Sequence, residues 1–161
     1  MKYLLIIFVV AIALAPLSHF MPSKRQRQIA KLREYAAVHG LFVEFRSQPG
    51  RSQPGSDVGG DKSRDRAGHD TIYYGKRLPP SKQKRGQQSG VWLREPGGWV
   101  SLERRLPVPA PLQDLPAEIL AASVDEGSCG IYWRESGGVE LVAQITRTLE
   151  LWSEELRATE S

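Results

Sequence analysis

Residues 91–102 read VWLREPGGWVSL, in which two short runs of apolar and aromatic residues flank the turn-forming residues EPGG. Proline and glycine are the residue types that a tight turn between antiparallel strands needs. We therefore predict a β-hairpin with strands at 91–94 and 99–102. Three further strands are predicted from β-branched and aromatic residues in other stretches. They lie at 41–45, 71–74 and 129–134, and Gly75 ends the second of them.

Helical signals precede and follow these strands. Ser23 and Gly40 are suited to cap the two ends of a helix over 24–39. Asp114 can cap a short helix over 116–123. After residue 138, apolar side chains recur at spacings of three and four residues, which predicts an amphipathic helix. Its apolar stripe consists of Val142, Ile145, Leu149, Trp152 and Leu156. The stripe either covers the sheet or docks a partner, and we favour the sheet because an aromatic sheet needs a cover.

The N-terminal segment has a different character, because residues 3–20 read YLLIIFVVAIALAPLSHF and hold no Lys, Arg, Asp or Glu. As a helix they would span about 27 Å, close to the roughly 30 Å hydrocarbon core of a bilayer. We therefore predict a single transmembrane anchor over 1–21. It precedes a soluble α+β domain over 22–161, with a small, mainly antiparallel sheet of about five strands and helices on one face. A cleaved signal peptide is the alternative, although Pro16 directly after the candidate site ALA is unfavourable for cleavage.

Positive charge follows the apolar segment directly. The basic cluster consists of Lys24, Arg25, Arg27, Lys31 and Arg33. Basic residues flanking a membrane helix favour the cytoplasmic side, and they can contact anionic lipid headgroups. We therefore expect a single-pass protein of the inner (plasma) membrane, held in lipid through residues 3–20, with its C-terminal domain in the cytoplasm.

Charge and polarity are unevenly distributed in the soluble part. Residues 24–105 hold 18 basic and 8 acidic side chains, whereas residues 106–161 hold 3 basic and 10 acidic ones. Within the basic half, residues 46–70 have almost no apolar side chain and begin with the tandem repeat RSQPGRSQPG. Such a segment buries too little surface to offset its ordering entropy, so we predict a flexible loop over 46–70.

The chemistry-bearing residues form no catalytic or metal-binding pattern. The three histidines are not spaced as metal ligands, and no phosphate-binding glycine loop is present. Cys129 is the only cysteine, and nothing in the sequence links it to His39, the histidine at an ordered position of the soluble part. Trp92, Trp99 and Trp133 lie on predicted strands, where they can stack on nucleic acid, but no RNA-binding motif accompanies them. We expect no enzymatic activity, cofactor, metal or nucleic-acid ligand.

These patterns favour an interaction protein. The expected function is that of a membrane-anchored accessory or assembly protein whose small cytoplasmic domain binds another protein at the membrane surface. The alternative is an exported, periplasmic or secreted, binding protein or enzyme with a cleaved signal peptide. The state of the N-terminus in the purified protein distinguishes the two hypotheses.

Overall fold

The computed structural model describes residues 3–4, 6–8, 22–50, 71–80, 89–103 and 106–159. The chain divides into two compact units, Met1–Lys31 and Leu32–Ser161, and each is described by itself.

The first unit contains the beginning of helix α2, Lys24–Val38. The backbone N–H of Gln26 donates to Ser23 Oγ at 3.2 Å, and the N–H of Ser23 donates to Gln26 Oε1 at 2.8 Å. This reciprocal pair satisfies two backbone donors at the start of the helix, so the predicted cap at Ser23 is confirmed. Most of the predicted membrane segment, residues 5 and 9–20, lies outside the described residues. Among the residues that are described, no helix combines the length and the apolar character needed to cross a bilayer.

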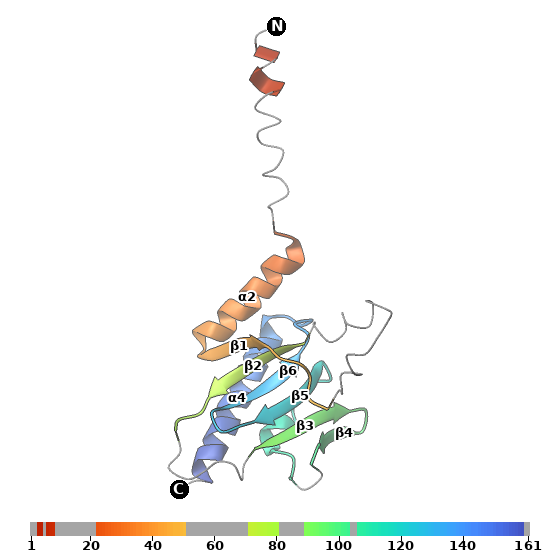
Figure 1. Cartoon of the computed structure of the whole chain (residues 1–161), viewed down its shortest axis with the longest axis vertical. Coiled ribbons are helices and arrows are strands. Elements are labelled where there is room, and N and C mark those ends of the chain that lie inside the picture. The colour runs from red at the N-terminus through yellow and green to blue at the C-terminus, as the bar shows by residue number, and fades with distance from the viewer. Residues whose placement is uncertain are drawn as a thin grey trace, which may run out of the picture. The chain divides into compact units, whose positions relative to one another are not determined.

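The second unit is built on a single six-stranded sheet (Figure 1). Its spatial order is β1-β2-β6-β5-β3-β4, and every neighbouring pair is antiparallel. The strands are β1 Leu41–Phe45, β2 Ile72–Arg77, β3 Gly90–Glu95, β4 Gly98–Ser101, β5 Ile119–Val124 and β6 Ser128–Trp133. The predicted hairpin is confirmed, because Glu95 pairs with Gly98 across the turn. An α+β fold with an antiparallel sheet is therefore correct, with six strands in place of about five.

The predicted short helix over 116–123 is wrong, because this stretch contains strand β5. A short 3-10 helix, η2, precedes it at Ala110–Leu112. Strand β5 lies inside the sheet between β6 and β3, so both of its edges form backbone hydrogen bonds. A register shift between Ile119 and Ala121 breaks the alternation of the strand, which hides its period of two in the sequence. Burial inside the sheet overrides the local helix signal.

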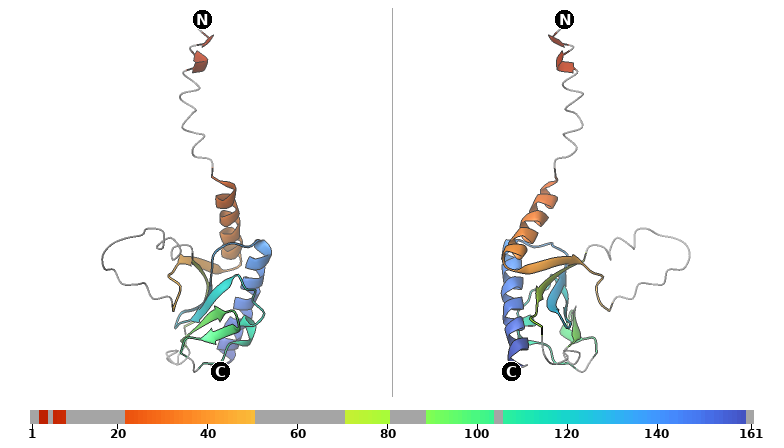
Figure 2. Two further views of the ribbon diagram at one scale, coloured as in Figure 1. Left: turned by 90° about the vertical axis from the view of Figure 1, so that its right-hand side faces the viewer. Right: turned by 60° about the vertical axis from the view of Figure 1, so that its left-hand side comes forward.

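One face of the sheet carries the helices and the main core (Figure 2). Helix α4, Val139–Ala158, lies along this face, and the last part of α2 contributes Leu32 and Ala36 to the same core. Trp92 of β3 meets Trp152 of α4 edge to face, with ring centroids 5.6 Å apart. These contacts remove large apolar side chains of the helices and the strands from water, which stabilises the fold.

An ion pair between the partly exposed Arg33 and the buried Glu135 ties the last part of α2 to the sheet. Glu135, directly after β6, accepts two hydrogen bonds of 2.7 Å from the Arg33 guanidinium and one of 2.8 Å from the Tyr74 hydroxyl. Burial and the bond to Glu135 raise the pKa of Tyr74, so its hydroxyl keeps its proton. The backbone φ of Glu135 is +51°, a value that residues other than glycine rarely adopt. The three hydrogen bonds of its carboxylate hold the residue in this conformation.

Candidate functional site

The face of the sheet opposite the helices is the first place to look for a site. Its centre is a small cluster of Tyr73, Ala121 and Tyr132. The Tyr73 ring lies directly against Gly130, where a Cβ would fall 2.2 Å from the ring. Gly75, the cross-strand partner of Gly130, leaves room for Phe42 in the same way. Two glycines thus let aromatic rings replace a covering helix.

Residues 46–50, the first RSQPG copy, add a further layer over these rings. The Arg46 guanidinium lies 4.0 Å from the centroid of the Tyr73 ring, and Glu44 holds it at 2.7 Å. At the other end, Gly50 lies so close to Leu93 of β3 that a Cβ would fall 2.9 Å from that side chain. At the start of the predicted loop over 46–70, Arg46 and Gly50 therefore lie against the sheet. Residues 51–70, with the second copy, lie outside the described residues.

A shallow depression of about 250 Å³ lies beside this cover. Its lining includes the Asp125 carboxylate, which accepts hydrogen bonds from the N–H groups of Gly127 at 2.9 Å and Ser128 at 2.7 Å. The Ser128 hydroxyl also donates to Asp125 at 3.1 Å and lies 3.2 Å from the Tyr73 hydroxyl. Burial raises the pKa of Tyr73 to about 12. The polar groups satisfy one another, so this arrangement stabilises a turn and leaves no activated nucleophile.

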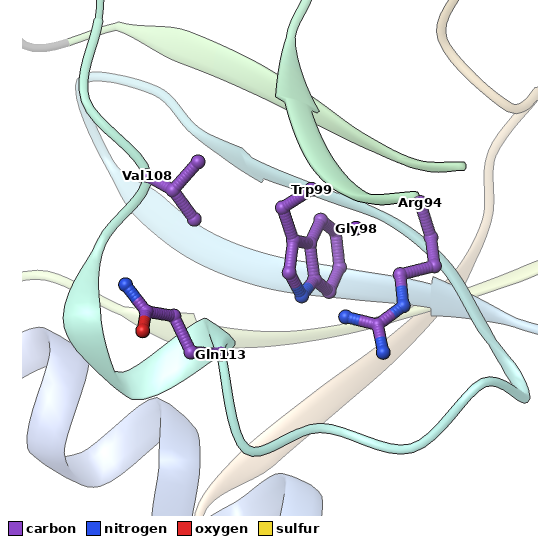
Figure 3. Close-up of a pocket in the computed structure, with 5 residues that line it drawn as sticks. All are labelled: Arg94, Gly98, Trp99, Val108 and Gln113. Atoms are coloured by element: carbon purple, nitrogen blue, oxygen red, sulfur yellow. The ribbon is translucent and has the colours of Figure 1, made fainter. Parts of the chain in front are cut away.

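A larger depression, of about 370 Å³, lies beside the hairpin at the end of the sheet (Figure 3). Arg94 of β3 and Trp99 of β4 are cross-strand partners, and the Arg94 guanidinium carbon lies 5.3 Å from the centroid of the Trp99 indole ring. Figure 3 shows Val108 and Gln113 on one side of the indole and Arg94 on the other. No acidic residue is among the described residues that line it.

Unsatisfied donors mark the same end of the sheet. Within the described ranges, three buried side-chain polar atoms have no hydrogen-bond partner: Trp99 Nε1, Ser101 Oγ and Trp133 Nε1. Two of the three belong to β4, and Trp99 and Ser101 lie on one face of this strand because they are two residues apart. A buried donor without an acceptor costs about 1–3 kcal/mol, so an acceptor that reached these groups would be bound favourably.

The residues singled out from the sequence belong to other elements of the chain. Of the basic cluster, Lys24, Arg25, Arg27 and Lys31 belong to the first unit, whereas Arg33 belongs to the second and is bound to Glu135. The apolar stripe faces the sheet: Val142, Ile145, Leu149 and Trp152 are buried, and Leu156 packs against the same core.

The other candidates are also held within the structure. His39 Nδ1 lies 2.8 Å from the Tyr35 carbonyl oxygen at the end of α2. Cys129 is buried, and burial raises the pKa of its thiol to about 12, so it is not a nucleophile at neutral pH. No group of three potential metal ligands is found in the part of the chain that the structure describes.

The Arg94 and Trp99 pair was missed as a site in the sequence analysis, although its signal was present. In a hairpin whose turn is 96–97, the residues two places outside the turn on each strand are partners, and here they are an arginine and a tryptophan. Val108 and Gln113 come from a segment that only the fold brings near. Comparisons with family models, with curated proteins and with solved structures find no match to this chain.

Proposed function

We propose that this chain is a single-pass, membrane-anchored accessory or assembly protein whose small cytoplasmic domain binds another protein at the membrane surface. The apolar segment 3–20 and the basic residues that follow it support the anchor and its orientation. The unequal charge of the two halves of the soluble part supports a basic side near anionic lipid and an acidic side away from it.

The observation that carries the proposal is the partly exposed pair Arg94 and Trp99 beside the outermost strand. Tryptophan and arginine are the residue types that most often dominate the binding energy of protein interfaces. The depression next to them is open and shallow, which suits a side chain of a partner better than an enclosed small molecule. Val100 and Leu102 are also exposed, and they place apolar side chains on the opposite face of the same strand and of the turn that follows it.

Site-specific photocrosslinking in cells tests the interaction. A photoreactive amino acid replaces Val100, which is 40% exposed at the sheet edge, and in a matched variant replaces Leu151, which is 49% exposed on α4. A discrete protein adduct is expected at Val100 and not at Leu151. Adducts of equal yield at both positions, or none at either, would contradict the proposal.

The anchor has its own test. Mass spectrometry of the full chain purified from membranes is expected to show an intact N-terminus, and a cytoplasmic reporter fused after Ser161 is expected to be active. A mature chain that starts near Pro16 would instead favour the exported alternative. Replacing the five basic residues after the apolar segment with glutamine is expected to weaken the orientation of the fusion.

A further inference from the structure

We infer that the open edge of β4 binds an extended segment of the partner protein, and that an acidic side chain of this segment is held by Arg94 beside Trp99. The inference rests on the proposed function, because it names the kind of protein segment that the domain binds. It is carried by the strand order, by the position of the Arg94 side chain and by the unsatisfied donors.

Strand β4 is a terminal strand of the sheet. It pairs with β3 on one side, and no described strand pairs with its other side (Figure 1). An exposed strand edge presents unpaired N–H and C=O groups, which an extended peptide can satisfy by adding a strand. Backbone pairing of this kind gives affinity without regard to sequence, so the neighbouring side chains must give specificity.

The row of side chains across the hairpin places a charge near that edge. Arg94 and Trp99 are opposite each other on neighbouring strands, and an added strand would place its own residue next in the row, about 4.8 Å beyond Trp99. The Arg94 guanidinium lies over the indole rather than over β3, which brings it toward this third position. A carboxylate at the third position can therefore meet the guanidinium in a charge-assisted hydrogen bond.

The donors around this row favour a carboxylate over other groups. Trp99 Nε1 and Ser101 Oγ are buried on the same face of β4 without acceptors among the described residues, and the depression has no acidic lining residue there. A carboxylate has two oxygens and about four acceptor positions, more than any neutral side chain. One acidic side chain can thus serve Arg94, and it would accept from the buried Trp99 Nε1 only where the added segment displaces the side chains that cover this atom.

The opposite side of the added strand meets a different surface. Leu93 and Val100 form the adjacent cross-strand row, and Val100 is exposed. Because neighbouring residues of a strand point to opposite faces, the residues on either side of the acidic one would face this surface, one beside Val100 and the other beside Gly98. The added strand can run in either direction, so the segment expected is apolar, acidic and apolar, with β-branched residues at the apolar positions.

A second copy of this chain fits the edge poorly. Strand β4 reads GWVS and has no acidic residue, so pairing of two β4 strands would supply no carboxylate to Arg94. It would also bring two arginine side chains toward the same edge, which like charge disfavours.

Fluorescence anisotropy with the full chain in detergent micelles tests the inference. The probes are the labelled peptides STVEVTS and STVQVTS, which differ only in one charge, and a form of STVEVTS in which alternate amides are N-methylated. We expect the glutamate peptide to bind at least about tenfold more tightly than the glutamine peptide. Arg94→Gln should abolish this difference, whereas Arg147→Gln, a change on α4, should preserve it. N-methylation should abolish binding.

Each result decides the matter. Equal binding of the glutamate and glutamine peptides, or a preference that survives Arg94→Gln, would overturn the charge recognition. Binding of the N-methylated peptide would overturn strand addition, and so would self-association through β4 that the peptide does not displace. The urea midpoint of each variant is measured first, and Arg94→Lys, which keeps the charge, should retain part of the preference. Crosslinking at Val100 together with equal binding of the glutamate and glutamine peptides would contradict this inference but not the proposed function.

Discussion

The two faces of the sheet are covered by different means. On one face, α4 and the end of α2 bury large side chains such as Leu149 and Trp152 to within 1% of full burial. On the other face, no described helix is present, and Tyr73 is equally buried because its ring lies on Gly130 beneath Arg46. The first face is stabilised by apolar area, whereas the second depends on the absence of a Cβ. Equally buried side chains on the two faces should therefore respond to different mutations: truncation on the helix side and addition of a Cβ on the opposite face.

Truncation of the helix-covered face should have the largest effect. Leu149→Ala removes a fully buried side chain and is expected to lower the free energy of unfolding by about 2–5 kcal/mol, as other core truncations do. Leu102→Ala, at a side chain that is 47% exposed, should change it by less than about 0.5 kcal/mol. Urea unfolding followed by tryptophan fluorescence measures both. Equal effects would show that the stripe is not part of the core.

Addition of one methyl group should damage the opposite face. Gly130→Ala is expected to lower the free energy of unfolding by about 1–3 kcal/mol, because the new Cβ overlaps the Tyr73 ring. Gly97→Ala is the control, since nothing lies within 4 Å of a Cβ there. In a Tyr73→Ala background the cost at Gly130 should disappear, which a double-mutant cycle detects. A cost that persists in that background would mean that the backbone, not the ring, requires glycine.

High pH should lower the free energy of unfolding, first through Cys129 on the helix side and then through Tyr73 on the opposite face. Burial raises the pKa of Cys129, on the helix side, from 9.0 and that of Tyr73 from 10.0, each to about 12. The unfolded chain loses these protons first, so the stability is complete below pH 9 and is lost as the pH rises toward 12. At pH 10 the Cys129 thiol should account for a loss of about 1.4 kcal/mol. Denaturant titrations from pH 8 to 11 should show a later onset in Cys129→Ala, and an onset unchanged by this variant would contradict the assignment.

Deletion within the repeat should have the smallest effect. Removal of either RSQPG copy leaves the same sequence, with one copy directly after β1, so the cover over Tyr73 can form again. Five residues fewer in a long loop change the closure free energy by well under about 0.6 kcal/mol, and the melting temperature should hardly move. Deletion of both copies removes Arg46 from the Tyr73 ring and should cost about 1–2 kcal/mol. Equal melting temperatures for the two deletions would show that the cover contributes nothing.

The sequence predicted the elements whose signal is local. The hairpin followed from Pro96 and Gly97, and the start of α2 followed from the Ser23 cap. Strand β5 was missed because Ala121 and Ala122 favour a helix and its bulge hides the alternation. Gly75, expected to end a strand, lies inside β2 because Phe42 needs the space above it. Arg94 and Gln113 border the same depression only through the path of the chain, which no local pattern contains.

Because Cys129 is buried, the reactivity of its thiol reports whether the domain is folded. It is the single thiol of the chain, and it lies on β6 beneath the helices, so a thiol reagent has one target that it can reach only after the domain opens. The rate of alkylation in intact cells would therefore report opening of the domain at its native location, where optical denaturation cannot be used. A cysteine placed anywhere on the surface would be the only readily reactive one, and labels could be attached without first removing the natural residue.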